Sequence, residues 1–409
     1  MRTFTSILLA VAFAASTHAA DLPDLALQPA RIVTEVDSDH AKSSRGAQGV
    51  PAVERVPQGR LWAAWYAGKS PRGVESPSSY VVLATSGDDG ATWTEKLVLL
   101  APRLCHTYDP CLWLDPADRL WFFWAQSAGL QDGRMGVWAV TTNKPDAENP
   151  DWTEPRRISN GVMLNKPTVL RNGTWLLPVG YWRDSTNVPN ITFDEKVIAP
   201  YTNAGLAHDL GDERGSNVVA SSDGGRTFEQ IGQVRMPGTR VDEHMLVERR
   251  DGSLWMLIRN TGGIAQSSST DGGRTWSAGT MFLTGGATAS KRFFLRRLRS
   301  GALLLVRNNA PTGATRSHLT AFVSDDEGLT WQGGLLLDER ESSYPDGAEG
   351  IDGALYVIYD HQRYTLNRAG KSGVGSVLLA KFTEADVRAG RAVSEQARLQ
   401  TVVTRLREE

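Results

Sequence analysis

One short motif, Ser-x-Asp-x-Gly-x-Thr followed by an aromatic residue, occurs four times in the 409-residue chain. Its copies occupy residues 86–93, 221–228, 269–276 and 324–331. Each copy has the chemistry of a hairpin turn, because glycine permits a positive φ while Ser and Asp side chains bond back to turn amides. The aromatic residue then anchors the turn in the sheet. A motif repeated at intervals indicates a chain built from like units.

A second repeat, a glycine or polar turn followed by an apolar strand, counts these units. Its six copies lie at 58–62, 118–121, 172–176, 251–255, 300–304 and 352–356. Six units of four strands predict an all-β, six-bladed β-propeller over residues 21–390. The second and third blades are expected to keep little of the first motif, with 145–152 as a degenerate copy. The widest gap, at 181–213, predicts a long insertion loop beside the site.

The two ends of the chain have their own signatures. Residues 1–20 have the features of a signal peptide, with Arg2 ahead of an apolar run too short to span a bilayer. The protein is therefore expected to be secreted or periplasmic and free of the membrane after cleavage. Residues 383–386 form a capping-box sequence. The tail at 391–409 is expected to be a surface helix or a frayed end.

Charge and cysteine content exclude several classes of function. The net charge of −2 gives no global basic field for nucleic acid. Cys105 and Cys111 are the two cysteines of the chain, and whether they pair in an exported protein stays open. They offer too few ligands for a metal site, and no cofactor is expected.

Polar residues precede each predicted inner strand, at the end of the channel where those strands begin. We call this end the mouth. The candidates there are Gln48, His106, Tyr108, Asp109, Lys166, Glu243, His244, Arg292 and Tyr344. Carboxylates mixed with cations, His and Tyr suit the binding of an acidic sugar and acid–base chemistry on a glycosidic bond.

The first motif is the Asp-box, and the chain resembles the sialidase (BNR/Asp-box) superfamily along most of its mature length. The resemblance implies a retaining exo-glycosidase that removes a terminal sialic acid or another acidic sugar from a glycan. Such enzymes use a Tyr nucleophile, a Glu that takes its proton, an Arg triad that binds the substrate carboxylate, and an acid/base Asp. By local motif, Tyr344 resembles the nucleophile, Glu243 its activator and Arg259 one triad member. The last triad member is Arg316 by motif position or Arg292 by its phase in the blade.

Two departures accompany this resemblance. The family opens blade one with Arg-Ile-Pro, whereas residues 48–51 read Gln-Gly-Val-Pro, so that Gln48 stands where the first Arg belongs. The usual acid/base Asp is also missing, and Glu75 is the nearest substitute. His106 is a further candidate acid or base, because His titrates near neutral pH.

Two other functions stay open. One is a lyase acting on a uronic acid polymer, with His106 or His244 and a Tyr as base and acid. The other is a glycan-binding propeller without catalysis. The fold alone does not choose among the three functions.

Overall fold

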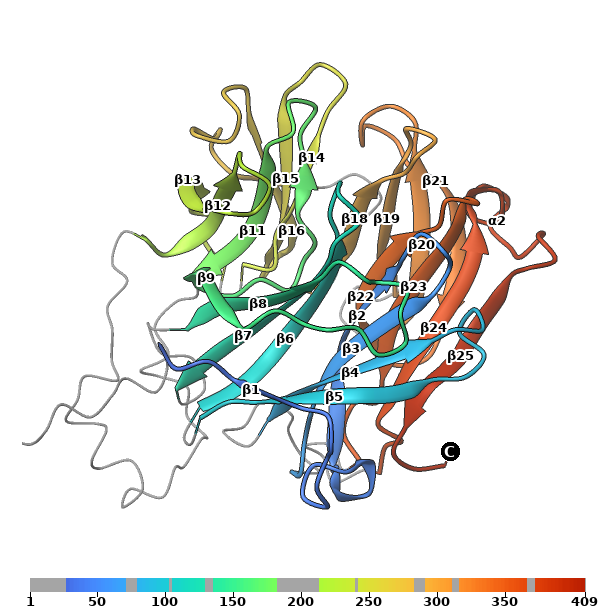
Figure 1. The fold of residues 1–409 in the computed structure, drawn as a ribbon. Helices are drawn as coiled ribbons and strands as arrows, with labels where there is room; N and C mark the ends of the chain where they lie inside the picture. The colour runs from blue at the N-terminus through green and yellow to red at the C-terminus, as the bar shows by residue number, and fades with distance from the viewer. Residues whose placement is uncertain are drawn as a thin grey trace, which may run out of the picture.

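The computed structural model describes residues 27–70, 79–102, 105–128, 135–181, 213–239, 242–282, 291–310, 316–365 and 372–408. Over these residues the chain forms six antiparallel sheets, each built from one contiguous stretch of sequence. This confirms the predicted six-bladed propeller. Figure 1 shows the blades succeeding one another around the molecule in chain order, from blue to red, so that the first and last blades are neighbours.

The blades in the first half of the chain follow the order of the sequence. Blade one contains β1 (Arg31–Val33), β2 (Ala47–Arg55), β3 (Leu61–Gly68), β4 (Tyr80–Ser86) and β5 (Thr94–Leu100), with the 3-10 helix η2 (Lys42–Ser44) before β2. Blade two contains β6 (Cys105–Leu114), β7 (Leu120–Ala128), β8 (Gly136–Thr142) and β9 (Arg156–Asn160). Blade three contains β10 (Thr168–Val169), β11 (Trp175–Tyr181), β12 (Gly215–Ser221) and β13 (Glu229–Val234).

The second half repeats this arrangement. Blade four contains β14 (Met245–Glu248), β15 (Leu254–Asn260), β16 (Gly263–Ser269) and β17 (Thr280–Met281). Blade five contains β18 (Phe294–Arg297), β19 (Leu303–Asn308), β20 (Leu319–Ser324) and β21 (Gln332–Asp338). Blade six contains β22 (Ser342–Glu349), β23 (Ala354–His361), β24 (Ser376–Thr383) and β25 (Arg398–Arg405).

Inner strands of neighbouring blades contact one another around the axis: β2 contacts β6 and β22, and β14 contacts β10 and β18. Each inner strand runs from the mouth to a tight turn at the opposite end, which we call the turn end. There Gly59 and Gly353 adopt φ values of 101° and 75°. The second strands are packed between sheets, and every residue of β3 and β23 is buried. Such burial on both faces explains why these strands are almost continuously apolar in the sequence.

The Asp-boxes join the third and fourth strands of blades one, three, four and five. The expectation that blade three would lack one was wrong, because the copy at 221–228 connects β12 to β13. In each box, hydrogen bonds from the Thr side chain and amide hold the Asp, and they lower the pKa of Asp88 and of Asp326 to about 2. The glycine also serves blade packing: a Cβ on Gly328, whose φ is 87°, would lie 2.6 Å from Trp255 of the preceding blade.

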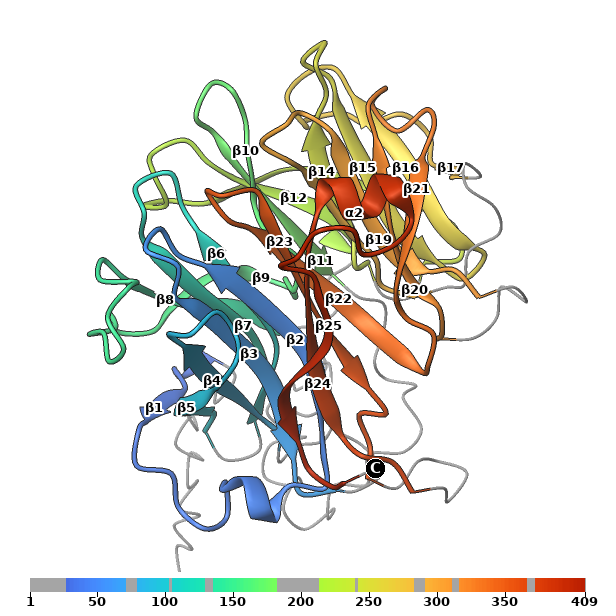
Figure 2. The same cartoon turned by 90° about the vertical axis from the view of Figure 1, so that its right-hand side faces the viewer.

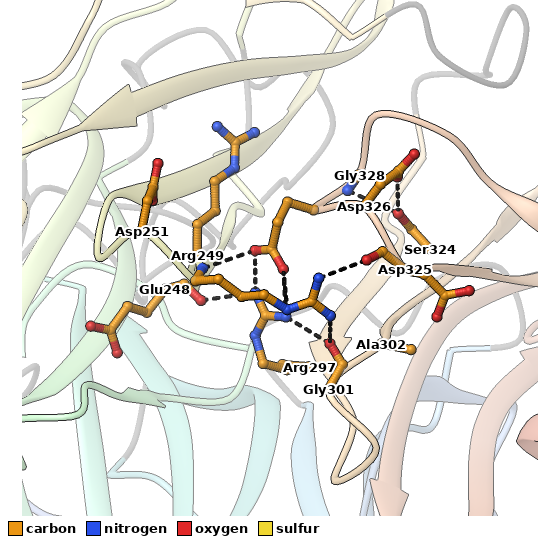
Figure 3. A network of polar contacts seen from close by, with 12 residues as sticks. Glu248, Arg249, Asp251, Arg297, Gly301, Ala302, Ser324, Asp325, Asp326 and Gly328 are labelled. Atoms are coloured by element: carbon orange, nitrogen blue, oxygen red, sulfur yellow. Dashed lines mark hydrogen bonds and ion pairs between the residues drawn. The ribbon is translucent and has the colours of Figure 1, made fainter.

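An ionic network joins blades four and five at the turn end, beside an Asp-box (Figure 3). Glu327, in the box itself, accepts from Arg297 at 2.6 Å and pairs with Arg250 at 3.3 Å. Arg250 also donates to the backbone carbonyl of Asp325 at 2.7 Å. The box residues that identify the fold are therefore engaged in holding turns and blades together, away from the mouth.

Blade six ends differently from the other blades. The capping box at Thr383 is present, and it starts the helix α2 (Glu384–Ala389), which packs against β21 of blade five. The tail was expected to be helical or frayed; instead, residues 398–405 form β25 and pair with β24 (Figure 2). The unpaired edge of β24 supplies the hydrogen-bonding partner that makes this strand favourable.

The ring closes without exchanging a strand between its ends, because β1 only extends the outer edge of blade one. Closure comes from the start of β2 lying against the segment that follows β23. The amide of Gln48 donates to the carbonyl of Arg363 at 3.0 Å, and the amide of Thr365 donates to the carbonyl of Gly46 at 3.0 Å. Ala47 and Tyr364 form a bridge between these contacts.

The remaining expectations concern cysteines, metals and membranes. Cys105 and Cys111 are both buried in β6 and no disulfide joins them, and burial raises the pKa of the Cys111 thiol to about 12. Among the described residues no three His, Cys, Asp or Glu side chains form a cluster able to hold a metal ion. No helix in this part of the chain combines the length and apolar character needed to cross a bilayer.

Candidate functional site

Three inner strands enter the mouth through the same local structure. Val50 in β2, Asp109 in β6 and Tyr344 in β22 adopt φ values of 51°, 45° and 54°, and each is followed by proline. At each of them the register shifts between the inner strand and the second strand of its blade. Bulges of this kind redirect side chains and are frequent beside active sites, as are non-glycine residues held at positive φ.

Tyr344 forms the centre of a buried group contributed by blades four and six. Its hydroxyl donates to Glu243 Oε1 at 3.0 Å, and Arg259 Nη1 lies 2.7 Å from the same oxygen and 3.3 Å from the phenolic oxygen. Glu243 precedes β14, Arg259 lies near the end of β15, and Tyr344 lies in β22. The carboxylate is placed to accept the phenolic proton, and the guanidinium is placed to stabilise the phenolate that would result.

The protonation of this group follows from its burial. Burial raises the pKa of Tyr344 most strongly, and the charge of Glu243 raises it further, while nearby Arg side chains oppose the shift. The phenol is therefore protonated at neutral pH and needs a base to become a nucleophile. Glu243 Oε2 is buried and has no hydrogen-bond partner among the described residues.

Positive charge surrounds Tyr344. The Cζ atoms of Arg316 and Arg363 lie 5.2 and 4.5 Å from the centre of its ring. Burial, and then the charges of Arg316 and Arg259, lower the pKa of Lys291. Within the described residues neither Arg316 nor Lys291 forms an ion pair with a carboxylate. An excess of cations in a partly desolvated site favours an anionic ligand.

Sequence reasoning did not include Arg363 among the candidates. It lies two residues beyond the end of β23, outside the strand-end positions that were considered, and no motif marks it. Its contact with Tyr344 arises within blade six, where the end of β23 pairs with the start of β22.

Gln48 comes two residues before the bulge at Val50, but its side chain is directed away from the Tyr344 group. Its amide nitrogen donates to the carbonyl of Gly375 at 2.7 Å and lies 3.4 Å from Thr404 Oγ1. The side chain is fully buried, between β2 and the outer strands of blade six. The bulge after Gln48 explains this placement, since a shift of one residue exchanges the two faces of a strand.

Lys166 and Arg292 form a buried layer inside the channel. Lys166 pairs with Glu54 at 3.1 Å and with Asp346 at 3.3 Å. Arg292 donates to Asn165 Oδ1 at 2.8 Å and to the carbonyls of Leu164 and Pro345. Both cations thus connect blades to one another. Of the two residues considered for the last triad position, Arg316 is the one that contacts Tyr344.

The replacement Lys166→Met tests this structural placement. It leaves the carboxylate of Glu54 buried without its cation and leaves Asp346 with only the more distant Arg292, at 3.6 Å, so the free energy of unfolding should fall by about 3 to 5 kcal/mol. Urea denaturation measures this loss. Lys144→Met, at an exposed pair with Asp151, is the control and should leave stability unchanged. Equal stability of the two variants would contradict the placement.

His106 and His244 are both buried. His244 is buried, with its ring nitrogens 3.0 Å from the carbonyl oxygen of Asp242 and 2.8 Å from that of Asn217, and burial lowers its pKa to about 4. His106 is buried and stacks on Tyr108, with ring centres 4.6 Å apart. Asp109 occupies the bulge position in blade two that Tyr344 occupies in blade six. Glu75 and most of the insertion at 181–213 lie outside the described residues.

The family of the chain follows from its sequence. The model of the BNR repeat-like domain matches residues 104–357, more than half of the chain. The chain belongs to the BNR repeat-like family. A sialidase from Micromonospora viridifaciens is 26% identical over 94% of the chain. The chain spans 62% of the length of that relative.

Solved structures show the same fold at lower identity. A leech intramolecular trans-sialidase has a TM-score of 0.63 at 15% identity, covering 87% of this BNR repeat chain and 71% of its own. The intramolecular trans-sialidase from Ruminococcus gnavus has a TM-score of 0.60 at 13% identity, covering 87% and 98%. The Hadza microbial sialidase Hz136 has a TM-score of 0.58 at 19% identity, covering 76% and 63%. These likenesses support the propeller architecture.

Proposed function

We propose that this protein is a retaining glycoside hydrolase that removes a terminal acidic sugar, such as sialic acid, from glycans. The observation that carries the proposal is the contact of Tyr344 with both Glu243 and Arg259, at 3.0 and 3.3 Å. A tyrosine hydroxyl buried between a carboxylate and a guanidinium is the arrangement that an activated phenolic nucleophile needs. The family relationship supports the reaction class.

In the first step, the phenolic oxygen of Tyr344 attacks the anomeric carbon while Glu243 takes its proton. A bond forms between carbon and tyrosine, and the bond to the leaving oxygen breaks. That oxygen receives a proton from an acid, for which Glu75 and His106 are the candidates. Water then cleaves the tyrosyl–sugar bond, so that the configuration is retained overall.

A phenol suits this substrate for an electrostatic reason. A carboxylate nucleophile would be repelled by the acid group of the sugar, whereas a protonated tyrosine approaches it without charge. Arg259 and Arg316 would bind that acid group by charge-assisted hydrogen bonds. For the lyase alternative, the ring of His244 is held by two backbone carbonyls, which leaves it poorly placed as a base.

The glycans would be met outside the cytoplasm, because residues 1–20 have the pattern of an export signal. The test is incubation with sialosides and uronic acid polymers in water labelled with heavy oxygen, with mass detection of products. We expect a released monosaccharide that carries the label, with retained anomeric configuration by NMR. An unsaturated product absorbing in the ultraviolet, or binding without any product, would contradict the proposal.

A further inference from the structure

Arg363 fills a space that the inner strand of blade one leaves empty. Gly49 of β2 faces it: a Cβ on Gly49 would lie 3.0 Å from Arg363 Cβ and 2.9 Å from Asp360 Oδ2. The backbone of Arg363 is held beside β2 through the hydrogen bond from the Gln48 amide. A side chain at position 49 and the Arg363 side chain therefore exclude one another, and this chain has glycine on β2 and arginine on the segment after β23.

Asp360 holds the guanidinium of Arg363 in place. Its Oδ2 lies 3.0 Å from Arg363 Nη2 and accepts from the amide of Val50 at 2.9 Å. Its Oδ1 accepts from Ser343 Oγ at 2.5 Å, and Ser343 Oγ in turn accepts from Arg363 Nη2 at 3.0 Å. One carboxylate thus links the bulges of blades one and six to the arginine between them. A side chain fixed this way loses little further freedom when a ligand binds.

In the described part of the chain, the guanidinium is held through Nη2. Within the described residues Arg363 Nη2 makes its polar contacts, while Nε and Nη1 have no protein acceptor. The side chain is 7% exposed and lies over the Tyr344 ring. Arg316 lies over the same ring, and Arg259 reaches the hydroxyl. Three guanidinium groups therefore converge on one tyrosine, and Nε and Nη1 of Arg363 have no acceptor among the residues that the structure describes.

We propose that Arg363 is a substrate-binding residue that, with Arg259 and Arg316, holds a carboxylate attached to the carbon that Tyr344 attacks or to its neighbour. Gly49 is the residue that leaves space for the Arg363 side chain. The position of the acid group follows from the geometry, because all three arginines contact the tyrosine itself. This inference rests on the proposed glycosidase function and adds to it the residue that selects an acidic sugar.

The test compares two substrates that differ only in the acid group: an aryl sialoside and its carboxamide. Arg363→Ala is expected to lower kcat/KM for the acid by about 10- to 100-fold, the range for a lost charge-assisted hydrogen bond, and to leave the carboxamide nearly unchanged. Gly49→Ala retains every charge yet displaces Arg363, and it should cause the same acid-selective loss. Equal losses on both substrates would show a merely structural role and overturn the proposal.

Arg119→Ala is the matched control, because Arg119 pairs with the buried Asp115 at 2.6 Å near the turn end of blade two. It should leave both kcat/KM values unchanged, and thermal melting of all variants checks folding. If the wild-type protein cleaves no glycoside, the proposed function fails, but NMR titration with N-acetylneuraminic acid and its methyl ester still tests Arg363. Tenfold weaker binding of the acid alone in Arg363→Ala supports the inference, and unchanged binding overturns it.

Discussion

Tyr344→Phe is expected to reduce kcat on an acidic glycoside by at least about a thousandfold while leaving the fold intact. The replacement deletes the oxygen that would bond to the sugar, and loss of a nucleophile is among the largest single effects in covalent catalysis. The ring and its packing against Arg316 and Arg363 are kept, so substrate binding should survive. Initial rates with an aryl sialoside, together with circular dichroism, measure both properties.

Tyr359→Phe is the matched control for this experiment. Tyr359 is buried in the neighbouring strand β23 and donates to Asp338 Oδ2 at 3.2 Å, in the core of blades five and six. It loses an equivalent hydroxyl and should keep nearly all activity. If Tyr344→Phe turned over the substrate at the wild-type rate, Tyr344 would be excluded as the nucleophile. If neither Tyr344→Phe nor Tyr359→Phe released product, a propeller that binds glycans without catalysis would be favoured.

Glu243→Gln is expected to have the second largest effect, a fall in kcat of about a hundredfold to ten-thousandfold at neutral pH. Glutamine keeps the size of the side chain but cannot take the phenolic proton. The reaction then depends on the fraction of Tyr344 that ionises without help, and burial keeps the pKa of this phenol raised. Because the phenolate fraction grows as pH rises toward that pKa, the variant's rate should climb with pH where the wild-type rate has levelled.

The pH–rate profile thus distinguishes a lost base from a damaged site. Glu248→Gln, at the far end of β14 where Glu248 accepts from the Arg171 amide at 2.9 Å, should reproduce the wild-type profile. A Glu243→Gln variant with a normal rate and a normal profile would remove Glu243 from the mechanism. A uniformly low rate without recovery at high pH would indicate disruption of the site through Arg259 instead.

Much of the architecture could be predicted from the sequence because its determinants are local. A turn that needs glycine at positive φ, as at Gly328 with φ of 87°, depends on only a few adjacent residues and can be recognised from them. Repetition of such turns gave the number of blades. The tail was assigned less well, since β25 is a strand only because the open edge of β24 lies beside it.

The candidate site also contains residues that local sequence features indicate and residues that only the tertiary structure identifies. Residue type and strand phase placed Glu243, Arg259 and Tyr344 among the mouth residues, since each lies where a strand meets the mouth, and the resemblance to sialidases singled out these three. The choice between Arg316 and Arg292 depends on which of them reaches Tyr344, and that distance is a property of the assembled ring. The two cations inside the channel, Lys166 and Arg292, look like ligand-binding residues in the sequence because a buried inter-blade contact has no local signature.

The sequence by itself determined the blade count, the turns and the residue types around the mouth, because backbone conformation and strand periodicity act over a few residues. Only the tertiary structure decided which side chains share the site. A single bulge in β2 turns Gln48 away from the Tyr344 group, and Gly49 leaves a space of side-chain size. That space is filled by Arg363, more than three hundred residues later, because closing the ring lays the last blade against the first.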